Sequence, residues 1–149
     1  MKKYLLCKRF LIGCIILAPL YGCVTAQREK PTLELTFYGD SCSYHGPTLF
    51  KAGPVTLRFF NESEVSAAAN LVRHTGDETI QDMKDTFVEE PSTAHHPAWT
   101  TEIKGVWKVI EAGESHTWEG ILEPGIHTMV CARITPLGVW FGTGLTVEE

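Results

Sequence analysis

Short runs in which apolar and polar residues alternate recur along most of the chain. In the first run, over residues 33–38, Leu, Leu and Phe alternate with Glu, Thr and Tyr. A period of two places the apolar side chains on one face of a strand. Turn residues such as Gly53-Pro54 separate the runs. The pattern predicts further strands over residues 55–60, 67–74, 118–121, 126–132 and 140–147, with a hairpin turn through Leu122–Gly125.

One segment has the spacing of a helix instead. Thr79 is followed three residues later by Asp82, a variant of the capping box that begins many helices. Apolar residues then recur at helical spacing, at Ile80, Met83 and Phe87. Short strands with turn signals at roughly ten-residue spacing indicate a sandwich or barrel. We therefore predict one all-β, antiparallel domain over residues 32–149 that contains one short helix.

The first 22 residues have the pattern of an export signal. Four basic residues precede an apolar run from Phe10 to Leu20 that is too short to span a membrane. The sequence Leu20-Tyr21-Gly22-Cys23 resembles a bacterial lipobox, in which the cysteine is acylated and becomes the mature N-terminus. We predict a lipoprotein signal peptide over residues 1–22, then acylated Cys23 and a polar tether over residues 23–31. Cleavage by an ordinary signal peptidase, which leaves Cys23 as a free thiol, is the alternative.

The charge of the mature chain excludes one class of partner. After cleavage before Cys23, nine basic and 18 acidic side chains remain, a formal charge of −9. Binding of nucleic acid requires a basic surface, so we expect no nucleic-acid partner. Anionic lipid headgroups are disfavoured for the same reason. We expect the chain to contact a cell membrane or outer membrane through its lipid anchor, with the domain facing the periplasm or the cell exterior.

Two cysteines remain once Cys23 is acylated. Cys42 and Cys131 would then share an oxidising compartment, and a disulfide between them is the natural expectation. Such a bond closes a loop of roughly 90 residues, which is worth about 4–5 kcal/mol in the chain-entropy model. A reactive or metal-binding pair is the alternative.

The last third of the chain resembles the cupredoxin family of blue-copper proteins. The resemblance lies in Glu123-Pro124-Gly125 and the strand that leads to Cys131, and in the final strand with Gly144-Leu145-Thr146-Val147. It extends more loosely to the strand after Gly53-Pro54 and to Asn61. In that family the corresponding cysteine is a copper ligand at the end of the sheet. The resemblance implies a seven- or eight-stranded Greek-key sandwich.

The sequence departs from that family at the copper ligands. A blue-copper site needs two imidazoles and a thiolate, usually with a weak axial thioether. Family members carry a histidine and often a methionine after the cysteine, yet here no histidine follows His127 and no methionine follows Met129. The other ligand histidine should follow Asn61, and His74 lies too far along that strand. We predict that no copper cofactor is bound and that a Cys42–Cys131 disulfide fills the former metal position.

Other side chains are candidates for metal or partner binding. His116 and His127 lie on the two arms of the predicted hairpin, and either Glu114 or Glu119 could complete an adventitious zinc or copper site with them. Trp99 follows His95-His96 in a predicted surface loop over residues 89–101, where an exposed tryptophan could contact a protein or small ligand. We expect the apolar segment over residues 135–142 to cover the end of the sandwich, and the alternative is that it presents a binding patch.

The sequence favours a binding or structural role over catalysis. It has no G-x-S-x-G elbow, no Cys-His motif and no Gly-rich phosphate loop, so we expect no enzyme. Our main interpretation is a non-catalytic, lipid-anchored cupredoxin-like module whose partner the sequence does not identify. The alternative is a copper- or zinc-binding protein with an altered Cys/His ligand set. The two differ at Cys131, because a bridged cysteine cannot be a thiolate ligand.

Overall fold

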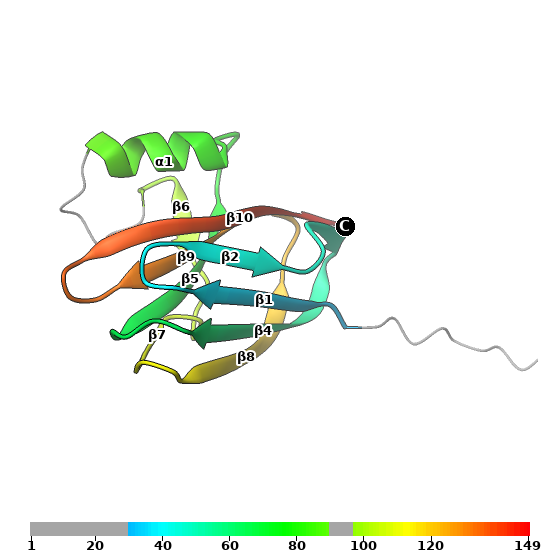
Figure 1. Cartoon of the computed structure of the whole chain (residues 1–149). Coiled ribbons are helices and arrows are strands. Elements are labelled where there is room, and N and C mark those ends of the chain that lie inside the picture. The colour runs from blue at the N-terminus through cyan, green and yellow to red at the C-terminus, as the bar shows by residue number, and fades with distance from the viewer. Residues whose placement is uncertain (1–29, 90–96) are drawn as a thin grey trace, which may run out of the picture.

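The described part of the protein is a sandwich of two β-sheets with one helix on its outside (Figure 1). The computed structural model describes residues 30–89 and 97–149. The first sheet has the strand order β2 (Cys42–His45), β1 (Thr32–Phe37), β4 (Gly53–Asn61) and β8 (Ser115–Leu122). The second has the order β3 (Leu49–Lys51), β10 (Gly138–Glu148), β9 (Gly125–Arg133), β5 (Ala67–His74) and β6 (Thr100–Glu102), with β7 (Lys108–Ile110) also paired to β5.

This architecture confirms the predicted all-β sandwich with a single short helix. Most strand pairs are antiparallel, while β1–β4 and β3–β10 are parallel. No helix in the described ranges is long and apolar enough to cross a membrane. The predicted signal segment, Cys23 and His95-His96 lie outside the described residues.

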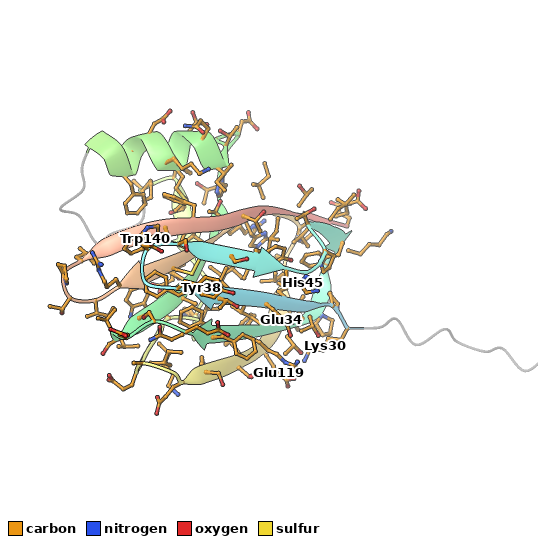
Figure 2. The ribbon with its side chains drawn as sticks, in the orientation of Figure 1. Lys30, Glu34, Tyr38, His45, Glu119 and Trp140 are labelled. Atoms are coloured by element: carbon orange, nitrogen blue, oxygen red, sulfur yellow. A yellow bond between two sulfur atoms is a disulfide. The ribbon has the colours of Figure 1, made fainter. Side chains whose placement is uncertain are left out.

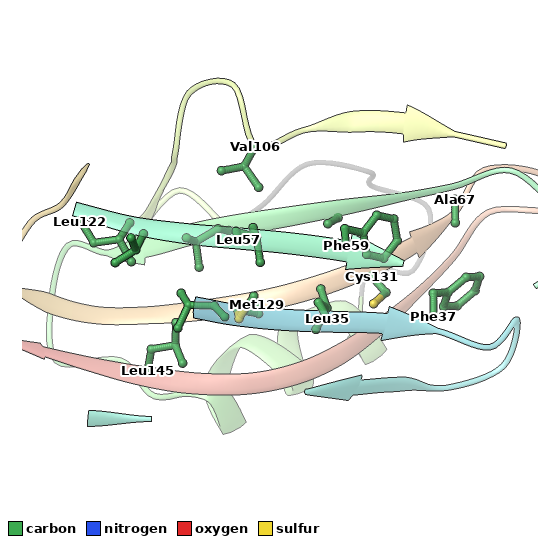
Figure 3. Packing of buried hydrophobic residues seen from close by; sticks show 14 of the residues in the cluster. Leu35, Phe37, Leu57, Phe59, Ala67, Val106, Leu122, Met129, Cys131 and Leu145 are labelled. Atoms are coloured by element: carbon green, nitrogen blue, oxygen red, sulfur yellow. The ribbon is translucent and has the colours of Figure 1, made fainter. Parts of the chain in front are cut away.

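The core lies between the two sheets and follows from the period-two pattern (Figure 3). In β1, Leu33, Leu35 and Phe37 are fully buried, while the residues between them are only partly covered. Each buried side chain of this size contributes about 1.5–3 kcal/mol through removal of apolar surface from water. The opposite sheet supplies the facing residues of this core, namely Ala67, Ala69, Leu71, Met129, Cys131, Leu145 and Val147.

Helix α1 (Ile80–Glu89) begins as the capping pattern predicts. The Asp82 carboxylate accepts hydrogen bonds from the Thr79 amide at 2.6 Å and the Thr79 hydroxyl at 2.7 Å. The Thr79 hydroxyl oxygen in turn accepts from the Gln81 amide at 3.2 Å. Met83 is buried against the outer face of the second sheet, in a cluster with Val72 and Val130.

The predicted hairpin through Leu122–Gly125 is wrong. Strand β8 pairs with β4 in the first sheet, whereas β9 pairs with β5 and β10 in the second. The link through Glu123-Pro124 therefore carries the chain from one sheet to the other, and Gly125 begins β9 with φ 138°. An alternating pattern identifies the buried face of a strand but not the strand it pairs with, so both arrangements fit the same sequence.

The real hairpin of this region joins β9 to β10, with Arg133 opposite Gly138. Residues 134–137 form its turn. The apolar segment over residues 135–142, which we expected to cover the end of the sandwich, therefore forms part of this turn and the beginning of β10. Within it, Leu137 is 45% exposed at the turn.

Candidate functional site

The predicted disulfide joins the two sheets. Cys42 begins β2 in the first sheet and Cys131 lies in β9 of the second, with their Cα atoms 5.9 Å apart. Cys131 is fully buried in the core. The bond confirms the cysteine pairing expected from the sequence, and it leaves no thiolate at Cys131 to act as a metal ligand.

The surroundings of the disulfide are filled by apolar side chains. Trp140 lies beside Cys131 on β10, and its ring centroid is 5.2 Å from that of Phe37. The Arg133 guanidinium carbon lies 5.3 Å from the centre of the Trp140 ring, within the range of a cation–π contact. At Gly142 a Cβ atom would lie 3.5 Å from the Cys42 sulfur and only 2.6 Å from the Leu35 side chain. This end of the sandwich is therefore closed and apolar.

Asn61, to which the sequence resemblance extends, has a structural role. Its side-chain amide donates to the Val65 carbonyl at 2.7 Å and the Glu111 carbonyl at 3.0 Å. Its amide oxygen accepts from the Ser63 hydroxyl at 2.6 Å. Asn61 is 1% exposed, and these bonds tie the end of β4 to two neighbouring loops.

His116 and His127 do not lie on two arms of one hairpin. His116 is half-buried on β8 opposite Phe59, whereas His127 is fully buried on β9. Burial, together with the charge of Lys108, lowers the pKa of His116. Among residues 30–89 and 97–149, no three His, Cys, Asp or Glu side chains gather as metal ligands would. The proposed set of His116, His127 and Glu114 or Glu119 is thus not assembled in the described structure.

Trp99 is half-buried rather than exposed. Its ring meets the His74 ring edge-on, with centroids 5.2 Å apart. The Thr75 amide and hydroxyl both donate to the Trp99 carbonyl, at 2.9 and 2.8 Å, and hold Trp99 beside the end of β5. Trp107, which is 43% exposed, presents more of its side chain to solvent. Whether Trp99 contacts a partner stays a prediction.

His74 lies on the same outer face and has a partner at each ring nitrogen. Nδ1 lies 2.6 Å from the Glu78 carbonyl, and Nε2 lies 2.8 Å from the Thr128 hydroxyl. The residue is 5% exposed. Both nitrogens are thus engaged, and the ring connects β5, β9 and the start of the helical region.

A cavity of about 480 Å³ lies at the end of the sandwich away from the disulfide. Its walls come from the end of β5, from β6 and the residues after it, and from the link between β8 and β9. An Arg73 Nη1 atom donates to the Glu123 carboxylate at 2.5 Å across one side of this space. The lining residues are Arg73, His74, Thr75, Thr101, Glu102, Ile103, Lys104, Ile121, Glu123 and His127.

Two buried polar atoms without hydrogen-bond partners belong to residues that line this cavity, namely Arg73 Nε and His127 Nε2. Burial lowers the pKa of His127 to about 4, so its ring is neutral at pH 7. Its Nδ1 lies 3.3 Å from the Gly125 carbonyl oxygen, which can only accept a proton. The proton is therefore assigned to Nδ1, and Nε2 presents a lone pair.

The sequence alone does not predict this cavity, although it contains one signal of it. His127 is two and four residues before Met129 and Cys131, so it faces the same side of β9 as these core residues. Arg73 lies opposite His127 because of the register in which β5 pairs with β9, and the sequence pattern does not give that register.

The first domain residues anchor the chain to the first sheet (Figure 2). The Lys30 ammonium donates to the Glu119 carboxylate on β8 at 2.8 Å. This hydrogen bond and the positive charge lower the pKa of Glu119. The Pro31 carbonyl accepts from the Thr56 amide on β4 at 3.0 Å. The chain is therefore attached to the first sheet from Lys30 onward.

Comparison with known proteins finds similarity only among solved structures. No protein-family model and no curated protein sequence matches the chain. Auracyanin A, a blue copper protein from the green thermophilic photosynthetic bacterium Chloroflexus aurantiacus, is 19% identical, with 78% of this chain and 98% of that chain covered and a TM-score of 0.47. Auracyanin from Roseiflexus castenholzii is 21% identical, covering 79% and 97%, with a TM-score of 0.43. Auracyanin B is 21% identical, covering 82% and 93%, with a TM-score of 0.45.

Proposed function

We propose that the protein is a non-catalytic, lipid-anchored binding module that acts outside the cytoplasm on a cupredoxin-like sandwich without a blue-copper site. The observation that carries this proposal is the Cys42–Cys131 disulfide. A blue-copper centre needs a free thiolate, and the cysteine in the corresponding position is instead bonded to the opposite sheet. A disulfide of this kind also favours an oxidising compartment over the cytosol.

The residues around Cys131 support the same conclusion. Trp140 and Phe37 fill the space beside the disulfide, and in the sequence no histidine follows the cysteine. The alternative function, binding of copper or zinc by an altered Cys/His set, requires Cys131 to be free. The proposal and this alternative therefore make opposite predictions about one thiol.

Metal content and thiol content, measured on one preparation, test the proposal. A soluble form that begins at Val24 is incubated with copper and with zinc, dialysed, and analysed for bound metal. Thiols are counted after denaturation, with a chemically reduced sample as the control that should show two. We expect no free thiol and no stoichiometric metal. One equivalent of retained copper together with a reactive Cys131 would overturn the proposal in favour of a metal-binding protein.

Lipid attachment is tested separately on the full chain. In a bacterial host fed labelled palmitate, we expect label on the wild-type protein and its recovery with membranes. Cys23→Ser should lose the label and leave the membrane fraction, because the acylated residue of the lipobox is gone. Cys14→Ser, which alters another cysteine of the predicted leader, is the matched control and should remain labelled. Label that persists in Cys23→Ser would refute the anchor.

A further inference from the structure

We propose that the cavity between the end of β5 and the β8–β9 link binds a small apolar amino acid, a ligand whose carboxylate lies next to an ammonium group. The inference deepens the proposed function, because it names a ligand class for the binding module. It rests on the cavity, on the charges that line it, and on the two buried polar atoms of Arg73 and His127 that lack partners.

Charges of both signs line this cavity. Arg73 and Lys104 contribute the cationic groups, whereas Glu102 and Glu123 contribute the anionic groups. A ligand with one sign of charge would be attracted to one pair and repelled by the other. A zwitterion can place its carboxylate near the guanidinium, which retains donors beyond its single bond to Glu123, and its ammonium near the carboxylates.

His127 distinguishes an amino acid from other zwitterions. The residue is fully buried, and the lone pair of its Nε2 has no hydrogen-bond partner in the described structure. Buried polar atoms of folded proteins are almost always hydrogen-bonded, so an orphaned acceptor beside a cavity indicates a donor that arrives with the ligand or with water. A primary ammonium has N–H donors for this lone pair, whereas a quaternary ammonium has none.

The size and the apolar part of the cavity fit an apolar side chain. A volume of about 480 Å³ lies within the range of about 300–1,000 Å³ that is usual for small-molecule sites. Ile103 and Ile121 are the aliphatic residues of the lining, and Ile121 is 70% exposed without a ligand. Covering such surface with an aliphatic side chain is favourable, so leucine is a suitable probe.

Titration with a matched set of ligands tests the proposal. The soluble form that begins at Val24 is titrated with leucine, 2-hydroxy-4-methylpentanoate, 4-methylpentanoate and 3-methylbutylamine, and binding is followed by amide NMR shifts and calorimetry. We expect leucine to bind with the highest affinity, the hydroxy acid more weakly, and the carboxylate and the amine at least about tenfold more weakly than leucine. Equal affinity for leucine and 4-methylpentanoate would overturn the proposal, as would no leucine binding at about 10 mM.

Two variants locate the site. His127→Leu removes the lone pair and keeps an apolar side chain on the core face, and we expect its leucine affinity to fall at least about tenfold. Arg73→Met removes the guanidinium and should have a similar effect. His116→Leu, on the other sheet, is the matched control and should bind as wild type. Wild-type affinity in both cavity variants would refute the assignment.

Folding and the proposed function are checked independently. Each variant is first shown by circular dichroism and thiol counting to be folded and bridged, and His127→Gln replaces His127→Leu if the latter does not fold. For His127→Gln the expected result is the same loss of leucine affinity, because its amide cannot reproduce the position of the imidazole lone pair. A bridged, metal-free wild-type protein that does not bind leucine would overturn this inference alone, whereas free thiols with bound copper would overturn the proposed function.

Discussion

Replacing both Cys42 and Cys131 with alanine removes the disulfide that joins the two sheets, and the loss of stability can be calculated from the length of the loop that the bond closes. The two cysteines are 89 residues apart in sequence. Closing a loop of that length lowers the entropy of the unfolded chain by an amount equivalent to about 4–5 kcal/mol at 25 °C. Loss of the buried Cys131 sulfur adds about 1 kcal/mol, because surrounding side chains collapse only partly into the space.

A loss of about 5 kcal/mol is large beside the total stability of a domain, which is commonly about 5–15 kcal/mol. In urea, where the free energy of unfolding of a small domain falls by about 2 kcal/mol per molar, the midpoint should decrease by about 2–3 M. The assay is equilibrium unfolding in urea, followed by tryptophan fluorescence, on the oxidised wild type, the reduced wild type and the double variant.

The reduced wild type separates the two contributions to this loss. It lacks the crosslink but keeps both sulfur atoms, so its stability should lie between those of the oxidised protein and the double variant, and close to that of the variant. A decrease of less than about 1 kcal/mol in both samples would refute the reasoning. Such a result would mean that the unfolded chain is already constrained without the bond, or that the sheets are not crosslinked in the folded protein.

Four further predictions concern single side chains. Asn61→Ala should lower the free energy of unfolding by about 2–4 kcal/mol in the same urea assay, because buried carbonyl groups lose their donor; a change below about 0.5 kcal/mol would contradict this. Thr79→Ala should destabilise helix α1 by about 1 kcal/mol, seen as faster amide exchange in the helix. Hydrogen bonds from Thr79 lower the pKa of Asp82. The ionised Asp82 carboxylate therefore stabilises helix α1 at neutral pH, and this stabilisation is lost as pH falls through the lowered pKa. Amide exchange rates in the helix that do not change in acid would refute this. Burial lowers the pKa of His127 in the folded protein from 6.5 to about 4. Because the unfolded chain then binds the proton more readily, the free energy of unfolding should decrease by up to about 3 kcal/mol as pH falls from 6.5 to 4. His127→Leu should remove that part of the pH dependence and His116→Leu should remove less, as unfolding at pH 7 and 4.5 would show.

The regular elements could be predicted because their signals are local. Strand β5 has the bounds predicted for it, 67–74. Strand β1 is offset by one residue from the predicted run 33–38, and β4 extends the predicted run 55–60 by two residues at its start and one at its end. Helix α1 begins where Thr79 and Asp82 place it, since a cap involves residues only three apart. The disulfide followed from counting cysteines in an oxidising compartment.

The features that failed prediction depend on neighbours distant in sequence. The alternation in β8 and β9 specifies a buried face, yet it does not say whether the link at Glu123-Pro124 closes a hairpin or crosses between sheets. Strands β3, β6 and β7 have three residues each, too few to show a period. Trp99 was expected in an exposed loop, but its burial depends on where that loop meets His74.

The chain enters the sandwich at only one of its two ends. Strand β1 begins at Thr32, opposite Thr56, at the end where β8 finishes and β9 starts. That end holds the cavity, while the disulfide lies at the other. Lys30 is seven positions after Cys23, and even a fully extended chain over that interval reaches only about 25 Å. If Cys23 is acylated as we propose, the end of the sandwich that holds the cavity is the end nearest to the lipid anchor along the chain. A ligand of the cavity would then bind at the membrane-proximal end of the domain, and the disulfide would hold the two sheets together at the distal end.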